Sequence, residues 1–145
     1  VGRHRHVRPQ RRLLEREAKM RSIFRAAPIG IGVVVSRRLM EVNDRICAMT
    51  GYSPEELVGQ SARILYPTEA DYEYVGREKY RQIAEHGTGT VETRWRHKDG
   101  HVIDVLMSST PIEPGDLSVG VTFTALLKRR RRISKDEGRR NENFG

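Results

Sequence analysis

The sequence predicts an α+β domain: one five-stranded antiparallel sheet with short helices on one face, preceded by an N-terminal amphipathic helix. Three observations support this class. The length of 145 residues suits one hydrophobic core. The predicted elements run as a helix, two strands, several short helices and three strands. Such segregation of helices from strands is typical of an antiparallel sheet covered on one side.

The start of the chain combines a basic segment with a helix. Residues 1–12 are rich in arginine and poor in apolar side chains, which predicts a disordered basic tail. Apolar side chains then recur at helical spacing over residues 13–27, which predicts an amphipathic helix. We expect its stripe to pack on a partner subunit or on the outer sheet face, with Leu13, Met20 and Phe24 as the dimer interface.

The middle of the chain predicts a hairpin followed by helices. Residues 29–35 and 39–43 have strand composition and are separated by a polar turn. Helices are predicted at residues 44–50, at a short segment opened by a capping box from Ser53 to Glu56, and at residues 69–85. Four residues here are explained as turn and cap residues, namely Asn43, Gly51, Ser53 and Gly59.

The last third predicts three strands, at residues 90–97, 101–112 and 118–127. Asp99-Gly100 separates the first two, which predicts a tight hairpin with positive φ at both residues. In the last strand apolar residues alternate with glycine or threonine, so one face is expected to be more apolar than the other.

The net charge of +8 belongs to the two ends of the chain. Residues 13–127 carry 14 basic and 16 acidic side chains, whereas residues 1–12 and 128–145 are strongly basic. The folded part therefore lacks the basic surface of a nucleic-acid-binding domain. Nucleic-acid binding through the two tails, of which the second is also predicted to be disordered, is kept as an alternative.

Several classes of protein are disfavoured. The sequence shows no apolar run long enough for a membrane span and no leader, so a soluble cytoplasmic protein is expected. It shows no Ser/His/Asp spacing and no phosphate-binding loop, so we expect no catalytic residues.

Three strings, in this order, resemble the PAS superfamily over about residues 20–127: RSIFRAAPIGIGVV, EVNDRICAMTGYSPEELVGQ and RWRHKDGHVIDVLMSSTPI. The resemblance implies a sensory and interaction module of a signalling protein, such as a sensor histidine kinase or a cyclic-dinucleotide enzyme. Such a module holds a small ligand, or docks a partner, and acts on an output domain. The family's Asp-Ile-Thr-type string after the last strand is replaced here by two leucines and a basic run. A free-standing docking domain without a ligand therefore stays open.

The resemblance also implies a ligand cavity between the sheet and its helices. One residue per element is predicted to line it: Val33, Ile46, Leu65, Tyr80, Trp95, Val105, Met107 and Thr122. Packing in the core or on a sheet face is the more frequent explanation for a lone tryptophan on a strand, so Trp95 and Tyr80 are candidates only.

No cofactor can be assigned. The flavin-binding branch of the family uses an Asn-Cys-Arg-Phe-Leu-Gln string that this sequence lacks, and Cys47 is explained as a small buried thiol. His86 lies at a predicted helix end, which favours a solvated or capping histidine over a haem ligand. His97 and His101 flank the Asp-Gly turn and are expected to face one another, but they offer too few ligands for a metal site.

Overall fold

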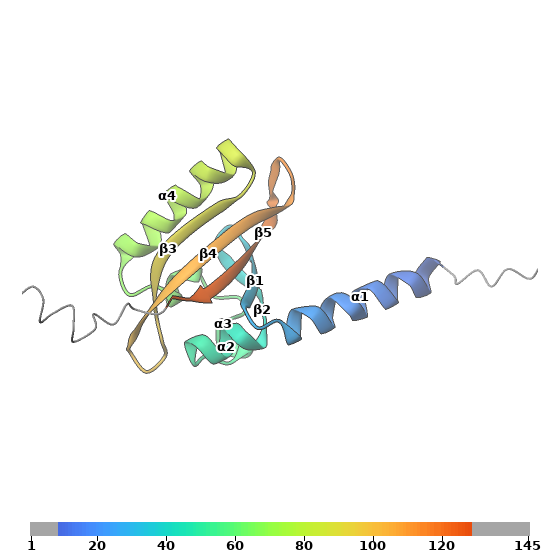
Figure 1. Ribbon diagram of the computed structural model, residues 1–145, viewed down its shortest axis with the longest axis horizontal. Helices are drawn as coiled ribbons and strands as arrows, with labels where there is room; N and C mark the ends of the chain where they lie inside the picture. The colour runs from blue at the N-terminus through green and yellow to red at the C-terminus, as the bar shows by residue number, and fades with distance from the viewer. Residues whose placement is uncertain (1–8, 129–145) are drawn as a thin grey trace, which may run out of the picture.

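The computed structural model describes residues 9–128. Its elements in chain order are α1 (Pro9–Ala26), β1 (Gly30–Val35), β2 (Arg38–Val42), α2 (Asp44–Thr50), α3 (Pro54–Leu57), the 3-10 helix η1 (Ala62–Leu65), α4 (Glu69–His86), β3 (Gly89–Arg96), β4 (Val102–Glu113) and β5 (Asp116–Leu127). The strands form one antiparallel sheet in the order β2-β1-β5-β4-β3. Figure 1 shows α4 running alongside β3, whereas α1 projects away from the sheet. The predicted fold class is confirmed.

Helix α1 begins at Pro9, before the predicted start at Leu13. Residues 9–12 are therefore helical instead of disordered. Proline is well tolerated in the first turn of a helix, and Arg11 lies 3.6 Å from Glu15 one turn later, an arrangement that supports an exposed helix. The rest of the two predicted basic tails, residues 1–8 and 129–145, lies outside the described residues.

Asn43 joins three elements. As the N-cap of α2, its side-chain oxygen accepts from the backbone N–H of Ile46 at 3.1 Å, and it also accepts from Ile31 of β1 at 2.9 Å. Its amide nitrogen donates to the carbonyls of Phe24 and Ile29 at 2.9 and 3.0 Å. The side chain is 1% exposed. The end of α1, the first strand and α2 thus meet at one buried amide.

Two of the other three predicted turn and cap residues cap helices, whereas Gly59, with φ 89°, follows the C-cap of α3, which is Val58. Gly51 ends α2 with φ 77°, in the left-handed region where glycine carries no steric cost. Ser53 and Glu56 complete a capping box at the start of α3.

The β3–β4 and β1–β2 hairpins differ in the backbone conformation of their turns. Between β3 and β4, only Gly100 has positive φ, and His97 N–H bonds His101 O at 2.8 Å across a three-residue loop. The three residues 98–100 thus separate the strands as predicted, but the prediction of positive φ at both Asp99 and Gly100 was wrong, because the three-residue loop needs it only at Gly100. The two-residue turn with both φ values positive joins β1 to β2 instead, at Ser36 (49°) and Arg37 (59°).

The hydrophobic core lies between the inner face of the sheet and the helices α2, α3, η1 and α4. The fully buried large side chains at its centre are Leu39, Ile46, Leu57, Leu65, Val75, Trp95 and Val105. Helix α1 contributes no buried residue. Within residues 9–128, no helix is both long and apolar enough to cross a membrane.

Candidate functional site

A small enclosed cavity lies inside the core, where the sheet meets η1 and α4. Its lining residues are Val34, Arg37, Leu39, Ala62, Leu65, Tyr66, Lys79, Trp95, Met107 and Phe123. The free volume is about 10 Å³, which is close to the minimum for a single water molecule. Most of the wall is apolar, but two of the residues that line it are cationic.

Lys79 is one of these cations and is only 5% exposed. It lies on the inward face of α4, one turn after Val75 and one turn before Ile83, and its ammonium nitrogen is 4.8 Å from the centre of the Tyr80 ring. Burial, reinforced by the positive charge of Arg37, lowers the pKa of Lys79 to about 8. No carboxylate is among the described residues that line the cavity.

Arg37 is the second cation and reaches the cavity from the strained β1–β2 turn. Its Nη2 donates to the carbonyl of Tyr72 at 2.8 Å, and its Cζ lies 3.5 Å from the centre of the Tyr72 ring. A Cβ at position 76 would come within 2.7 Å of Nη1, so Gly76 leaves the space that the guanidinium occupies. The Nε of Arg37 is buried without a hydrogen-bond acceptor among residues 9–128.

Trp95 and Tyr66 complete the polar part of the wall. Trp95 is fully buried, and its indole N–H finds no acceptor in the described part of the chain. The hydroxyl of Tyr66 bonds the sulfur of Met107 at 3.5 Å, and thioether sulfur is a weak acceptor. Burial raises the pKa of Tyr66, while the nearby Trp95 and Arg37 act in the opposite direction. The cavity is thus lined by several donors and few acceptors.

The predicted cavity residues divide into four groups. Leu65, Trp95 and Met107 line the cavity. Ile46 and Val105 are fully buried in the core but do not line it. Tyr80 is half-buried and lines a surface hollow between α4 and the β4–β5 hairpin. Val33 and Thr122 pair with each other on the outer face of the sheet.

For Val33 and Thr122 the predicted strand phase was wrong by one residue. The inward positions of β1 are Gly30, Gly32 and Val34, which alternate with half-exposed residues. Only glycine fits at the inward positions 30 and 32, because the side chains of Ile46 and Phe123 occupy the space that a Cβ atom would need. A glycine that makes room for a distant side chain cannot be recognised from a strand's own pattern.

Sequence reasoning missed Arg37 and Lys79. For Lys79 a signal was present, because it continues the helical stripe of Val75 and Ile83 at intervals of four residues. A lysine in such a stripe indicates a buried charge. For Arg37 the sequence contains no such signal, because a polar residue in a turn gives no indication that it contacts α4.

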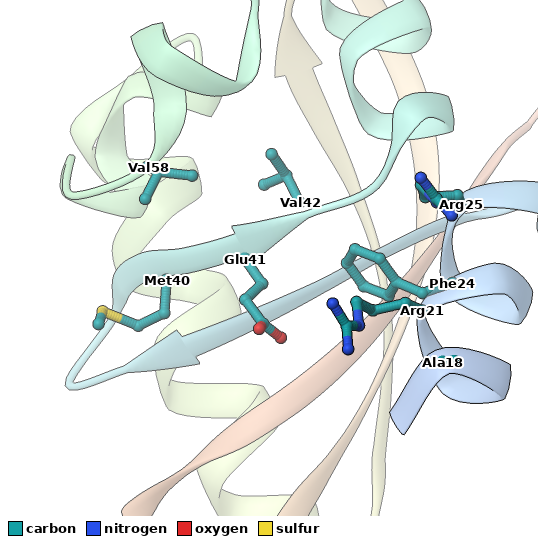
Figure 2. Close-up of a pocket in the computed structure, with 8 residues that line it drawn as sticks. All are labelled: Ala18, Arg21, Phe24, Arg25, Met40, Glu41, Val42 and Val58. Atoms are coloured by element: carbon teal, nitrogen blue, oxygen red, sulfur yellow. The ribbon is translucent and has the colours of Figure 1, made fainter. Parts of the chain in front are cut away.

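Two open hollows flank the base of α1. One, of about 530 Å³, lies between α1 and the edge strand β2, and Figure 2 shows Phe24 and Arg21 extending toward Glu41 there. The other, of about 550 Å³, lies over the outer sheet face and includes Val33. Phe24 borders both hollows and is half-buried.

The predicted interface residues of α1 are therefore not equivalent. Leu13 and Met20 are 58% and 64% exposed, whereas Phe24 rests against the body of the domain.

The side chains considered for cofactors lie apart from the cavity. Cys47 is half-buried on α2, and burial together with Asp44 raises its pKa. His86 is exposed at the end of α4 beside Glu85. His97 and His101 do stack, with ring centres 4.5 Å apart, and Asp99 is in reach of both.

Known proteins resemble this chain in sequence and in structure. The family model described as the PAS fold matches residues 18–125. Sensor protein TdiS of Thauera aromatica is 29% identical over 98 residues, which are 68% of this chain and 18% of that protein. The chain thus spans less than a fifth of the length of this curated relative.

Two solved structures also resemble it. The PAS domain of a protein from Colwellia psychrerythraea has a TM-score of 0.70 at 26% identity and covers 82% of this chain and 99% of its own. The PAS domain of a LuxR-family transcriptional regulator from Burkholderia thailandensis, in complex with ethanol, has a TM-score of 0.69 at 20% identity, with 74% and 95% covered.

Proposed function

The chain belongs to the PAS family, and on that premise we propose that it is a ligand-sensing module of a larger signalling protein. The enclosed cavity with unpaired buried donors is the observation that carries the proposal, because buried polar groups are normally satisfied. The resemblance to Sensor protein TdiS supports the sensory role. The ethanol bound by the Burkholderia thailandensis PAS domain favours a ligand of few atoms.

The module acts on an output domain and does no chemistry itself. None of the described residues around the cavity pairs a nucleophile with a general base. The output is a sensor histidine kinase or a similar regulator, in keeping with the sensor protein that the chain resembles.

The proposed signal leaves the cavity along β1 and β2. Val34 and Leu39 line the cavity, and the same two strands lead to Asn43, which holds the carbonyl of Phe24 at the end of α1. A ligand that moves this strand pair therefore changes the position of α1. Such coupling requires only that the two positions differ in ligand affinity.

Helix α1 forms a homodimer with a second copy in this proposal. Leu13 and Met20 are seven residues apart on α1, and Ile23 follows Met20 by three residues, which is the spacing of a coiled-coil seam. The exposed apolar side chains of α1 find no cover within the described chain. An isolated helix of this length is marginal in water, which favours a second helix as its partner.

Ligand sensing is tested with the full chain, purified without added ligand. Native mass spectrometry should detect a bound small molecule, or a panel of metabolites should contain one that raises the melting temperature. Ala62→Val, which narrows the cavity, should abolish the effect, whereas Ala84→Val on the exposed side of α4 should preserve it. If no molecule in a broad panel binds, the sensing role fails and a ligand-free docking module remains.

Dimerisation is tested separately by sedimentation. Leu13→Asp combined with Met20→Asp should convert dimers to monomers, because both side chains are exposed on α1. Tyr74→Asp, at a comparably exposed position on α4, should leave the dimer intact. An unchanged sedimentation coefficient in the double variant would rule out α1 as the interface.

A further inference from the structure

The donors and charges around the core cavity define the chemistry of what fills it. We propose that its ligand is a small anion, either a halide or a carboxylate or oxyanion of a few non-hydrogen atoms, held by Lys79, Arg37 and Trp95. The inference rests on the proposed sensing function and narrows it to one ligand class.

The first argument is charge. Lys79 and Arg37 line one cavity, and the described residues around it include no acid. A buried charge without a partner is strongly unfavourable, and two like charges in one site oppose each other further. A neutral ligand would leave both costs in place. An anion would offset both, because it pairs with each cation at once.

The second argument is hydrogen bonding. The Nε of Arg37 and the indole nitrogen of Trp95 are both buried donors without acceptors in the described structure. Trp95 is 0% exposed, so no solvent water reaches its N–H. The hydroxyl of Tyr66 donates to a weakly accepting sulfur, and the nearby Trp95 and Arg37 have only its single oxygen to share. An anion supplies acceptors where the site lacks them.

The third argument is the backbone of the β1–β2 turn. Ser36 and Arg37 both adopt positive φ, a conformation that favours glycine or asparagine. Arg37 is nevertheless held there by its hydrogen bond to the carbonyl of Tyr72. Its guanidinium fits because Gly76 has no Cβ atom to occupy the same space. The turn thus holds a guanidinium at the cavity wall in spite of its unfavourable backbone conformation, as is typical of strain kept at a functional site.

The size of the cavity limits the anion. About 10 Å³ of free volume is close to the minimum for one water molecule, so chloride requires a small outward movement of the apolar walls and a larger anion a greater one. Formate, acetate and nitrate are therefore the organic and inorganic probes of choice beside chloride. Gluconate is too large and serves to keep the ionic strength constant.

The test follows Lys79 directly in the full chain. The lysines carry a ¹³C label at Cε, and NMR measures the pKa of Lys79 while chloride, formate, acetate or nitrate replaces gluconate. A bound anion favours the charged amine, so the pKa of Lys79 should rise from about 8 by one or more pH units. The melting temperature should rise with the same half-saturation concentration. The anion with the lowest half-saturation concentration shows whether the site prefers a halide, a carboxylate or an oxyanion.

Three variants assign the donors. Lys79→Met should weaken binding at least tenfold. Trp95→Phe keeps an aromatic ring, although a smaller one, and removes the N–H, and Arg37→Asn suits the turn conformation while it removes the guanidinium. Each of these two should weaken binding severalfold. Arg77→Met, at an exposed position of α4, is the matched control and should bind as the unaltered chain does.

The outcomes separate this inference from the sensing function. A pKa of Lys79 that no anion moves, while a neutral metabolite raises the melting temperature, would overturn the anion inference and leave sensing intact. Equal anion effects in Lys79→Met and in the unaltered chain would also overturn it, as non-specific salt effects. If neither anions nor neutral molecules bind, both proposals fail together. Should Lys79→Met not fold, the Arg37 and Trp95 variants decide alone.

Discussion

Asn43 illustrates how much of this fold depends on one side chain. Its amide makes four hydrogen bonds: the bond to Ile46 caps α2, and those to Ile31, Phe24 and Ile29 link other segments to the start of α2. Because the group is buried, removal of the side chain leaves several backbone groups without partners, and water replaces few of them.

Asn43→Ala should therefore destabilise the domain by about 3 kcal/mol, at the upper end for single substitutions. Urea unfolding followed by circular dichroism measures the loss. Ser53→Ala is the matched control, because it removes a partly buried cap and should cost only about 1 kcal/mol. Similar losses in both variants would contradict the linking role of Asn43.

Lys79 makes stability depend on pH in the alkaline range. Its pKa is about 8 in the folded chain and 10.5 ordinarily, so between these values the unfolded state binds more protons. The free energy of unfolding should then rise as the pH increases from about 8, and below pH 8 the whole penalty of about 3 kcal/mol applies. The raised pKa values of Tyr66 and Tyr80 act against stability only above pH 10.

Lys79→Met should remove this dependence and be more stable than the unaltered chain at pH 7. Denaturant titrations of both proteins at pH 7, 8, 9 and 9.5, in gluconate buffer, give the difference in unfolding free energy at each pH. The difference should shrink steadily above pH 8. A constant difference across the range would show that Lys79 keeps its ordinary pKa.

At the scale of elements, the β1–β2 hairpin stores strain in its turn. Ser36 has φ 49°, where a side chain is unfavourable and glycine is not. Ser36→Gly should stabilise the domain by roughly 0.5–1 kcal/mol, measured as a higher urea midpoint with an unchanged slope. Gly100→Ser introduces the same kind of strain at φ 101° and should lower the midpoint. A lower midpoint for Ser36→Gly would show that the serine makes a contact worth more than the strain.

The elements also show what a sequence reveals about a fold. Asn43, Gly51 and Ser53 could be assigned as caps because their effects act within a few residues, and α2 and α3 were predicted at their observed positions. The phase of β1 could not be predicted, because Gly32 faces inward to make room for Phe123, which is distant in sequence. The site divides in the same way. Trp95 was predicted from its strand, whereas Arg37 reaches the cavity through a contact with α4.

At the scale of the whole molecule, the domain separates into a packed body and a projecting helix. The body holds the cavity and every buried residue of the core, whereas α1 is joined to it through Phe24 and the Asn43 amide. The projecting part of α1 therefore adds little to the stability of the body. In the proposed dimer, the two copies instead meet through the apolar stripe of α1, so dimerisation depends on the first half of this helix.

Removal of residues 1–19 separates these two roles. The shortened chain keeps Phe24 and its carbonyl, so its free energy of unfolding in urea should stay within about 0.5 kcal/mol of that of the unaltered monomer, as for a change away from the core. It loses Leu13, and with it the start of the seam, so it should sediment as a monomer at concentrations where the full chain is dimeric. If the body unfolds when these residues are removed, α1 is a structural part of the domain. A movement at Asn43 could then not be transmitted by α1 as a helix independent of the body. If the shortened chain stays dimeric, the interface lies on the sheet, and the outer-face hollow around Val33 becomes its first location to test.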